Sequence, residues 1–226
     1  MFKLSPSSLN LFQECPRCFY LTMHKIWKRP AGIFPSLPSG MDKILKTHFN
    51  NFRDKKLLPP ELAENKECRG MKLFAEKEKL KDWQSNFKGI QFTDKKGNIL
   101  RGAVDNILVK GKKLIVLDYK TRGFPLKEDT ADHYQLQLDI YNFLLKKNGY
   151  ETEDYAFLLF YVPKEVLSGG EIIFDTELVR MKVDGKRGER VWKRALGVLE
   201  GDAPKEHGKG RGGGGEGCGW CVNIEI

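Results

Sequence analysis

The feature that most constrains this fold is a pair of β-type runs joined by a very short connection. The first run covers residues 99–109, and the second covers residues 113–120 with an apolar stretch at its centre. Gly111 lies between them and tolerates a positive φ, so it suits the first central position of a two-residue type II′ turn. The pattern therefore predicts a β-hairpin in which Lys110 pairs with Lys113.

This hairpin register brings two acidic residues together. Asp105 is expected directly opposite Asp118, and Lys120 shares the face of Asp118 because side chains alternate along a strand. Opposed Cβ atoms lie about 4.5–5.5 Å apart, and like charges placed there repel. A divalent cation such as Mg²⁺ or Mn²⁺, which takes oxygen ligands, would reverse the sign of that interaction. The alternative for either aspartate alone is a solvated hairpin with scattered charges.

The composition, and above all the net charge, indicates which kind of molecule the protein binds. The chain has 226 residues and a formal net charge of +9, which favours an anionic partner, with nucleic acid as the first candidate and a merely basic surface as the alternative. No apolar run approaches the roughly 20 residues that span a bilayer. The first six residues lack a signal-peptide core. We therefore expect a cytoplasmic protein without a membrane association, in which cysteines stay reduced and free to bind metal.

The remaining periodicities predict a mixed α/β chain. Helices are expected at 5–14, 16–27, 37–56, 71–83, 129–147 and 186–199, and further strands at 87–93, 155–162 and 172–183. Residues 28–40 read as a loop, and the glycine-rich stretch 208–217 reads as a tether. The order of elements predicts one α/β domain over residues 1–226 with the hairpin at its centre.

Four cysteines form two C-x-x-C pairs at opposite ends of the chain: Cys15 with Cys18, and Cys218 with Cys221. Two intervening residues let both sulfurs of a pair turn towards one ion or cluster. A shared centre would join the terminal segments 1–30 and 202–226 around a core of about 37–200. Four thiolates suit either zinc or an iron–sulfur cluster, and the spacing does not choose between them. A redox dithiol and incidental cysteines are the alternatives.

With these residues in view, the chain resembles RecB-type members of the PD-(D/E)XK nuclease superfamily, especially the CRISPR-associated and helicase-linked exonucleases that carry a cysteine cluster. The resemblance is carried by residues 4–9 with Cys15-Pro16-Arg17, by Gly102-Ala103-Val104-Asp105, by Asp118-Tyr119-Lys120 and by Gln137-Leu138-Asp139-Ile140-Tyr141. The motifs that carry the resemblance extend from residue 4 to residue 221. It implies a restriction-endonuclease-like α/β core, with a central mixed β-sheet flanked by helices and termini joined by the four-cysteine site.

The resemblance also implies a metal site. Asp105, Asp118 and the carbonyl of Tyr119 would bind one or two Mg²⁺ or Mn²⁺ ions, with His48 as a fourth ligand. Such an ion lowers the pKa of a bound water and polarises the scissile phosphate. The family usually takes one cluster cysteine from the N-terminal region and three from the C-terminal end, whereas this chain divides them two and two. An iron–sulfur cluster is the expectation, and zinc stays open.

Three further residues would assist the chemistry. Lys120 would orient or deprotonate the attacking water and stabilise charge on the phosphate. Gln137 and Tyr141 are four residues apart on one helix, so they share a face that would hold Lys120 or the nucleic-acid backbone. A plain contact between helix and sheet is the alternative for this pair.

Five cations on or just before the last predicted helix are candidates for nucleic-acid contacts: Lys186, Arg187, Arg190, Lys193 and Arg194. Such a group neutralises phosphates without reading bases. A solvated helix face explains the same pattern equally well.

These features together predict a metal-dependent DNA nuclease. The resemblance implies that it hydrolyses phosphodiester bonds of single-stranded DNA or of DNA ends, in repair and recombination or in CRISPR adaptation, within a helicase–nuclease or CRISPR-adaptation complex. One alternative is a subunit of the same fold that binds nucleic acid without cutting it. Another is a cysteine-cluster protein that serves in redox sensing or assembly.

Overall fold

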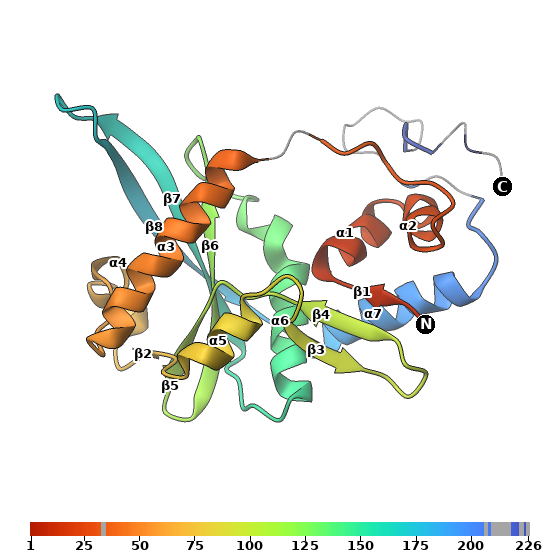
Figure 1. The fold of residues 1–226 in the computed structure, drawn as a ribbon, viewed down its shortest axis with the longest axis horizontal. Coiled ribbons are helices and arrows are strands. Elements are labelled where there is room, and N and C mark those ends of the chain that lie inside the picture. Colours follow the sequence, from red (N-terminus) through yellow and green to blue (C-terminus); the bar gives the residue numbers. More distant parts are fainter. Residues whose placement is uncertain (33–34, 206–207, 209–217, 222–223, 225–226) are drawn as a thin grey trace.

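A computed structural model describes residues 1–32, 35–205, 208, 218–221 and 224 (Figure 1). The helices are α1 (Pro6–Glu14), α2 (Pro16–Met23), α3 (Ser36–Asp54), α4 (Pro60–Ala63), α5 (Lys77–Trp83), α6 (Gln135–Lys147) and α7 (Gly185–Glu200), with short 3₁₀ turns η1 (Lys66–Cys68) and η2 (Ala131–Tyr134). The strands are β1 (Lys3–Leu4), β2 (Lys72–Leu73), β3 (Ile90–Thr93), β4 (Ile99–Gly102), β5 (Asn106–Lys110), β6 (Lys113–Thr121), β7 (Tyr155–Val166) and β8 (Ile172–Lys182).

The main sheet has five strands in the order β2-β5-β6-β7-β8. Strands β6 and β7 pair in parallel, with α6 in the crossover between them, and the other neighbours pair antiparallel. A smaller sheet has the order β1-β4-β3. The expected mixed α/β fold with a central mixed sheet is confirmed.

The predicted hairpin register is confirmed by β5 and β6. Lys110 pairs with Lys113 and Asn106 pairs with Leu117. Gly111 has a φ of +59°, as the first central position of a type II′ turn requires. Since Asp105 immediately precedes β5, it stands just beyond the last backbone pair of this ladder and next to Asp118 on the opposite strand.

Helices cover both faces of the main sheet (Figure 1). On one face, Val116 and Leu158 belong to the same buried cluster as residues of α1, α6 and α7. On the other face, Ile115 and Leu117 are buried with Leu45 and Phe49 of α3 and with Leu62 of α4. Alternate side chains of β6 therefore pack into two hydrophobic cores, one on each face of the sheet. Asp118 continues the even-numbered series of β6, which lies beneath α6.

One sequence expectation for this region was wrong. Residues 71–83 were expected as one helix, but Lys72 and Leu73 pair with β5 and helix α5 begins only at Lys77. Long-range pairing with a sheet edge outweighs the local helical period there. The expected helix 37–56 is confirmed as α3, which begins at Ser36, within the last residues of the expected loop 28–40. Residues 209–217 of the expected glycine-rich tether lie outside the described residues. Within the described part of the chain, no helix has the length and apolar character needed to cross a bilayer.

Candidate functional site

The carboxylate of Asp118 is buried where β6 passes beneath the first turns of α6. Its side chain is 1% exposed, and its Oδ2 forms an ion pair with the ammonium of Lys120. Gln137 on α6 approaches both groups: its Nε2 lies 3.4 Å from Asp118 Oδ1, and its Oε1 lies 3.4 Å from Lys120 Nζ. The ammonium also lies 4.6 Å from the ring centroid of Tyr134. The three predicted residues Asp118, Lys120 and Gln137 therefore meet at one place.

Asp105 completes the acidic pair. Its Oδ2 accepts a hydrogen bond of 2.9 Å from the main-chain N–H of Tyr119, and its Oδ1 lies 3.9 Å from Lys46 Nζ on α3. Burial and the charge of Asp118 raise the pKa of Asp105 to about 7. Burial likewise raises the pKa of Asp118, although the charge of Lys120 opposes that rise. Both carboxylates are therefore held where they would gain from additional positive charge.

Lys120 remains a cation in this setting. Burial by itself would lower its pKa, but the negative charges of Asp118 and Asp105 outweigh burial and raise it. The ammonium groups of Lys120 and Lys46 thus place positive charge among the carboxylates and offset their repulsion. A divalent ion would have the same effect.

Gln137 and Tyr141 share one face of α6, as expected. Gln137 Nε2 donates to Tyr141 Oη at 2.7 Å, and the Tyr141 hydroxyl donates to the carbonyl of Ala103 at 2.6 Å. A Cβ on Gly102 would lie 2.7 Å from the Tyr141 ring. Gly102 is therefore needed so that the tyrosine can reach the backbone of the segment that leads into Asp105.

His48, expected as a metal ligand, makes a different contact. Its Nε2 lies 2.9 Å from Glu61 Oε1, and the same carboxylate oxygen accepts a bond of 2.8 Å from the Tyr161 hydroxyl. The His48 ring also packs edge-on against Phe49 and Phe52. The structure therefore joins His48 to a neighbouring network on α4 and β7 and not to the two aspartates.

The sequence analysis missed Asp42. Lys46 Nζ lies 2.7 Å from Asp42 Oδ2 and also contacts Asp105, so it bridges the two carboxylates. The charge of Asp42 is also among the causes that raise the pKa of Asp105 and of Asp118. The signal was present in the spacing, since Asp42, Lys46 and Phe49 follow the helical period of the buried face of α3.

The four cysteines of the two C-x-x-C pairs lie together, and their Sγ atoms are all within 4.8 Å of one another. Cys15 Sγ is 3.7 Å from Cys221 Sγ, and Cys18 Sγ is 3.5 Å from Cys218 Sγ. All four are buried, and they are not joined by disulfide bonds. Sulfurs placed 2.3 Å from one tetrahedral ion lie about 3.8 Å apart, so the set fits a single ion. A four-iron cluster binds each thiolate at a different iron and needs a wider arrangement.

Arginine side chains reinforce this centre. Arg29 Nη2 donates to Cys218 Sγ at 3.1 Å, and Arg17 donates to the carbonyls of Pro204 and Ile224 at 2.8 and 2.5 Å. Burial raises the pKa of Cys218, but a backbone N–H bond from Trp220 and the neighbouring thiol and guanidinium groups outweigh it and lower the pKa to about 7. Thiolate character is therefore favoured at one ligand before metal binds.

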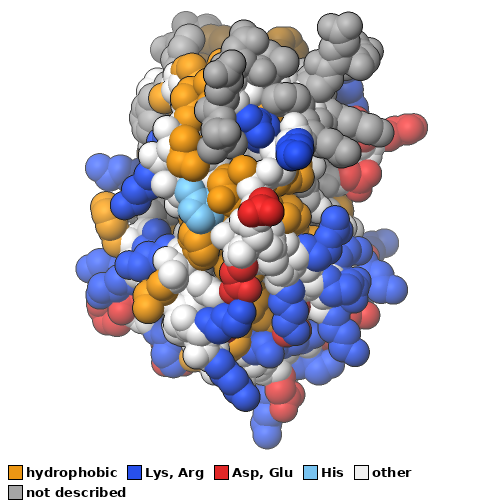
Figure 2. Space-filling view, turned by 90° about the vertical axis from the view of Figure 1, so that its right-hand side faces the viewer, with side chains coloured by type: hydrophobic (Ala, Val, Ile, Leu, Met, Phe, Trp, Pro, Cys, Tyr) orange, Lys and Arg blue, Asp and Glu red, His pale blue; other side chains and the backbone are white. Residues whose placement is uncertain are grey.

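The cations predicted on α7 are largely engaged within the protein. Arg187 Nη2 lies 2.9 Å from Asp139 Oδ1, and this aspartate is completely buried. Lys193 Nζ lies 3.0 Å from Glu189, and Arg190 Nη2 lies 3.6 Å from Asp184. Arg194 lies 6.0 Å from the ring centroid of Phe12, and the main-chain N–H of Lys186 donates to the side chain of Asp184, which caps α7. Lys and Arg side chains nevertheless spread widely over the molecular face seen in Figure 2.

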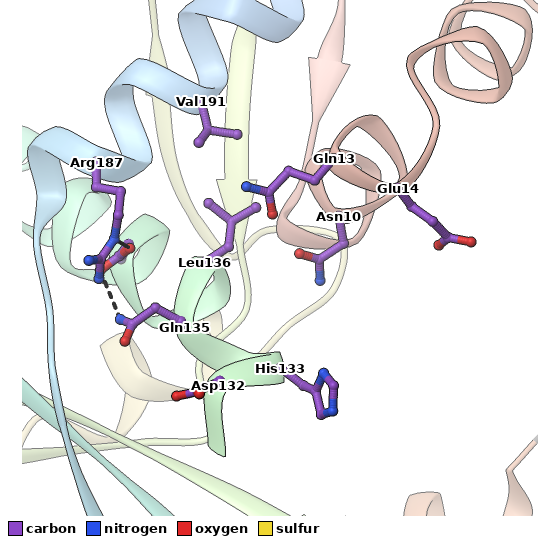
Figure 3. A pocket seen from close by; sticks show the side chains of 10 residues that line it. Asn10, Gln13, Glu14, Asp132, His133, Gln135, Leu136, Arg187 and Val191 are labelled. Atoms are coloured by element: carbon purple, nitrogen blue, oxygen red, sulfur yellow. Dashed lines mark hydrogen bonds and ion pairs between the residues drawn. The ribbon is translucent and has the colours of Figure 1, made fainter. Parts of the chain in front are cut away.

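A separate cavity of about 390 Å³ lies between α1, the start of α6 and α7 (Figure 3). Asn10 and Gln13 approach from α1, Gln135 from α6 and Arg187 from α7. Neither Asp105 nor Asp118 is among its lining residues. Arg187 is paired with Asp139, and Glu14, Asp132 and His133 line the cavity beside the amides, so it is a polar cavity separate from the site of Asp105 and Asp118.

A mixed sheet whose central hairpin ends in two acidic residues and a lysine, beneath a helix that carries glutamine and tyrosine, defines a nuclease-type α/β protein. The chain belongs to the PD-(D/E)XK nuclease superfamily, whose family model matches residues 37–224. Proteins of this superfamily are generally nucleases that use divalent metal ions, so the fold implies nucleic-acid binding. A search of curated proteins finds no significant match.

Proposed function

We propose that the protein is a RecB-like, Mg²⁺- or Mn²⁺-dependent deoxyribonuclease that hydrolyses phosphodiester bonds of single-stranded DNA or of DNA ends. The observation that carries this proposal is the meeting of Asp105, Asp118 and Lys120 at the end of the β5–β6 hairpin. Burial raises the pKa values of both acids, and the charge of Asp118 adds to the rise at Asp105, so the pair would gain from a shared cation.

The chain offers a donor set that suits such an ion. Asp105, Asp118 and the carbonyl of Tyr119 would hold it, and Asp42 takes the place first expected for His48 because Lys46 joins Asp42 to Asp105. A bound Mg²⁺ or Mn²⁺ would lower the pKa of a coordinated water and polarise the scissile phosphate.

The residues around the carboxylates would position the reacting groups. Lys120, kept cationic by its neighbours, would stabilise negative charge on the phosphate and orient the attacking water. Gln137 contacts both Lys120 and Asp118, so it fixes the ammonium relative to the carboxylate. Tyr141 in turn holds Gln137 and the Ala103 carbonyl. Both α6 residues would act as positioning residues.

We further propose that the four-cysteine centre holds one zinc ion, in preference to the iron–sulfur cluster that the family resemblance implies. The short Sγ–Sγ separations support this choice. The centre would fasten segments 1–30 and 202–226 to a core of about 37–200 within one nuclease unit. Because these thiols must stay reduced to bind metal, a cytoplasmic location suits them.

The wider role also remains a proposal. The resemblance to CRISPR-associated and helicase-linked exonucleases supports work on DNA in repair and recombination or in CRISPR adaptation, with a helicase–nuclease or adaptation complex as partner. The cations of α7, Lys186, Arg187, Arg190, Lys193 and Arg194, would contribute general phosphate attraction, although their ion pairs with acidic neighbours reduce it.

Incubating the protein with end-labelled single-stranded and double-stranded DNA, in Mn²⁺, in Mg²⁺ and in EDTA, tests the function. We expect degradation with either metal, none in EDTA, and a large loss of degradation with Asp118→Asn. Binding of DNA without cleavage under every metal condition would instead identify a non-cleaving subunit of the same fold.

A further inference from the structure

Arg53, near the C-terminal end of α3, is a buried cation that forms no ion pair with a carboxylate of the described residues, although the charge of Asp54 acts on it. Its side chain is 6% exposed. Nε donates to the carbonyl of Phe74 at 2.8 Å and Nη2 donates to Asn106 Oδ1 at 2.6 Å, while Nη1 is buried without a hydrogen-bond partner among the described residues. Guanidinium stays charged in proteins, and leaving such a charge buried and unpaired is costly. A bound anion would stabilise this buried guanidinium.

A cavity of about 420 Å³ opens beside this side chain, between the end of α3, strand β2 and the start of α5. Arg53 lines it together with Lys56, Lys72 and Lys77. Among the described residues, Asp54 is the one acidic residue that lines it, and that carboxylate is paired with Lys77. Within the part of the chain that the structure describes, the cavity thus has four cations and one carboxylate.

We infer that this cavity binds a phosphate group. A guanidinium offers paired donors that match phosphate oxygens, and lysine ammonium groups add mobile point charges around it. The apolar parts of Leu57, Leu73 and Ala75 also line the cavity, so the attraction acts beside low-dielectric walls. No residue assigned to the metal site is used here.

The location connects this pocket with the acidic site. Arg53 follows Lys46 by seven residues on α3, which is about 10 Å along a helix axis. Asn106, which accepts from Arg53, donates to the Tyr119 hydroxyl at 2.5 Å, and Tyr119 stands between Asp118 and Lys120. The bound phosphate therefore has two natural sources, a phosphodiester of a DNA strand that extends from the acidic site or a free phosphate monoester.

Substitution of Lys56 can remove one positive charge from the cavity without destabilising the fold. It has a φ of +57°, in the left-handed region that favours glycine, just after the end of α3. Lys56→Gly removes one cation from the cavity and relieves this backbone conformation, so its melting temperature is expected to stay the same or rise. Weaker anion binding by this variant could not be attributed to unfolding. Lys112→Ala, in the exposed hairpin turn, is the matched control for the loss of one positive charge.

Isothermal titration calorimetry in EDTA tests the inference with inorganic phosphate, deoxyadenosine 5′-monophosphate and a single-stranded oligonucleotide as separate probes. We expect at least one probe to bind about tenfold more weakly to Lys56→Gly and to Lys72→Ala, and unchanged to Lys112→Ala. Asp54→Ala should bind it more tightly, because the carboxylate that lines the cavity is removed. Equal binding of all three probes by the wild type and every variant overturns the inference, as does a complete lack of phosphate or DNA binding.

The probes separate the two sources. Loss confined to the oligonucleotide identifies a backbone phosphodiester, and loss confined to phosphate or the mononucleotide identifies a free monoester. The inference does not rest on the proposed nuclease activity, since no metal is present and no cleavage is measured. Weaker anion binding by Lys56→Gly together with a lack of Mn²⁺-dependent cleavage by the wild type would support this pocket and refute the nuclease, so failure of catalysis and failure of this pocket give different results.

Discussion

The main-chain N–H of Tyr119 donates a 2.9 Å hydrogen bond to the Oδ2 of Asp105, across the open end of the β5–β6 hairpin. This bond continues the strand pairing by one step after the backbone ladder has ended at Asn106. The position of Asp105 is consequently set by the hairpin itself, before any ion binds. Preorganisation of this kind lowers the cost of assembling a metal site.

Asp118→Asn should abolish most cleavage while keeping the fold. The amide matches the carboxylate in shape, and it removes one of two repelling acids from a buried place. We expect a loss of at least about a hundredfold in Mn²⁺-dependent degradation of labelled DNA. Asp175→Asn, which removes an exposed carboxylate paired with Lys164 on the β7–β8 ribbon, should cleave normally. Full activity in Asp118→Asn would refute the proposed site.

The raised pKa of Asp105 predicts how stability depends on pH without metal. Its pKa is about 7 in the folded state, above the ordinary value of 3.8, so the folded protein holds a proton that the unfolded chain has released. The free energy of unfolding should fall as pH rises from about 4 to about 7 and then level off. Urea unfolding in EDTA at several pH values should show this slope in the wild type and a weaker one in Asp105→Asn. A wild-type slope no steeper than that of the variant would contradict the raised pKa.

Adding Mn²⁺ should reduce the fall in the free energy of unfolding between about pH 4 and pH 7. An ion between Asp105 and Asp118 favours their charged forms, so ionisation no longer weakens the folded state. The unfolding series repeated with Mn²⁺ should therefore show the largest gain in stability at the upper end of the pH range. A gain that is uniform across the range would indicate that the ion binds elsewhere.

Asp42 and His48 provide a direct comparison on one helix. Asp42→Asn should raise the Mn²⁺ concentration needed for half-maximal cleavage by about tenfold, because a proposed oxygen ligand is lost. His48→Gln disturbs the contact with Glu61 and should change that concentration little. Titrating Mn²⁺ into cleavage reactions of both variants measures this concentration. A larger increase in His48→Gln than in Asp42→Asn would identify His48 as the ligand.

The cysteine centre should contain zinc that the fold needs. Cys15→Ser is expected to lose the metal, lower the melting temperature and expose the chain termini to protease, because metal binding contributes to folding. Cys68→Ala is the matched control, since that buried cysteine lies outside the cluster. Elemental analysis and an absorbance spectrum give the readout. A brown chromophore with bound iron would show that an iron–sulfur cluster is present instead.

Gly102→Ala tests the packing that supports the site. The new methyl group would lie 2.7 Å from the Tyr141 ring, so we expect a loss of about 1–3 kcal/mol in the free energy of unfolding together with reduced cleavage. Gly197→Ala on α7 has open space around the new methyl and should gain up to about 1 kcal/mol. Chemical denaturation of both variants measures the difference. Equal stability of Gly102→Ala and the wild type would show that the ring can move aside.

The features that depend on short-range interactions were predictable from the order of the amino acids. Gly111 and the alternating pattern around it fixed the hairpin register, since both act within a few residues. The 3.6-residue period predicted the helix that ends at Lys147, although α6 begins at Gln135 and not at residue 129, and each C-x-x-C pair predicted that its own two sulfurs turn towards one centre.

Only the tertiary structure decided which distant side chains share a site. The rotation of α3 about its axis is set by the packing of Leu45 and Phe49 on the sheet, and this rotation turns Asp42 towards Asp105 and leaves His48 with Glu61. The burial of Arg53 beside β2 likewise depends on the pairing of residues 72–73 with β5. Such contacts join residues far apart in the chain, so their geometry comes from the packing of whole elements and not from local preference.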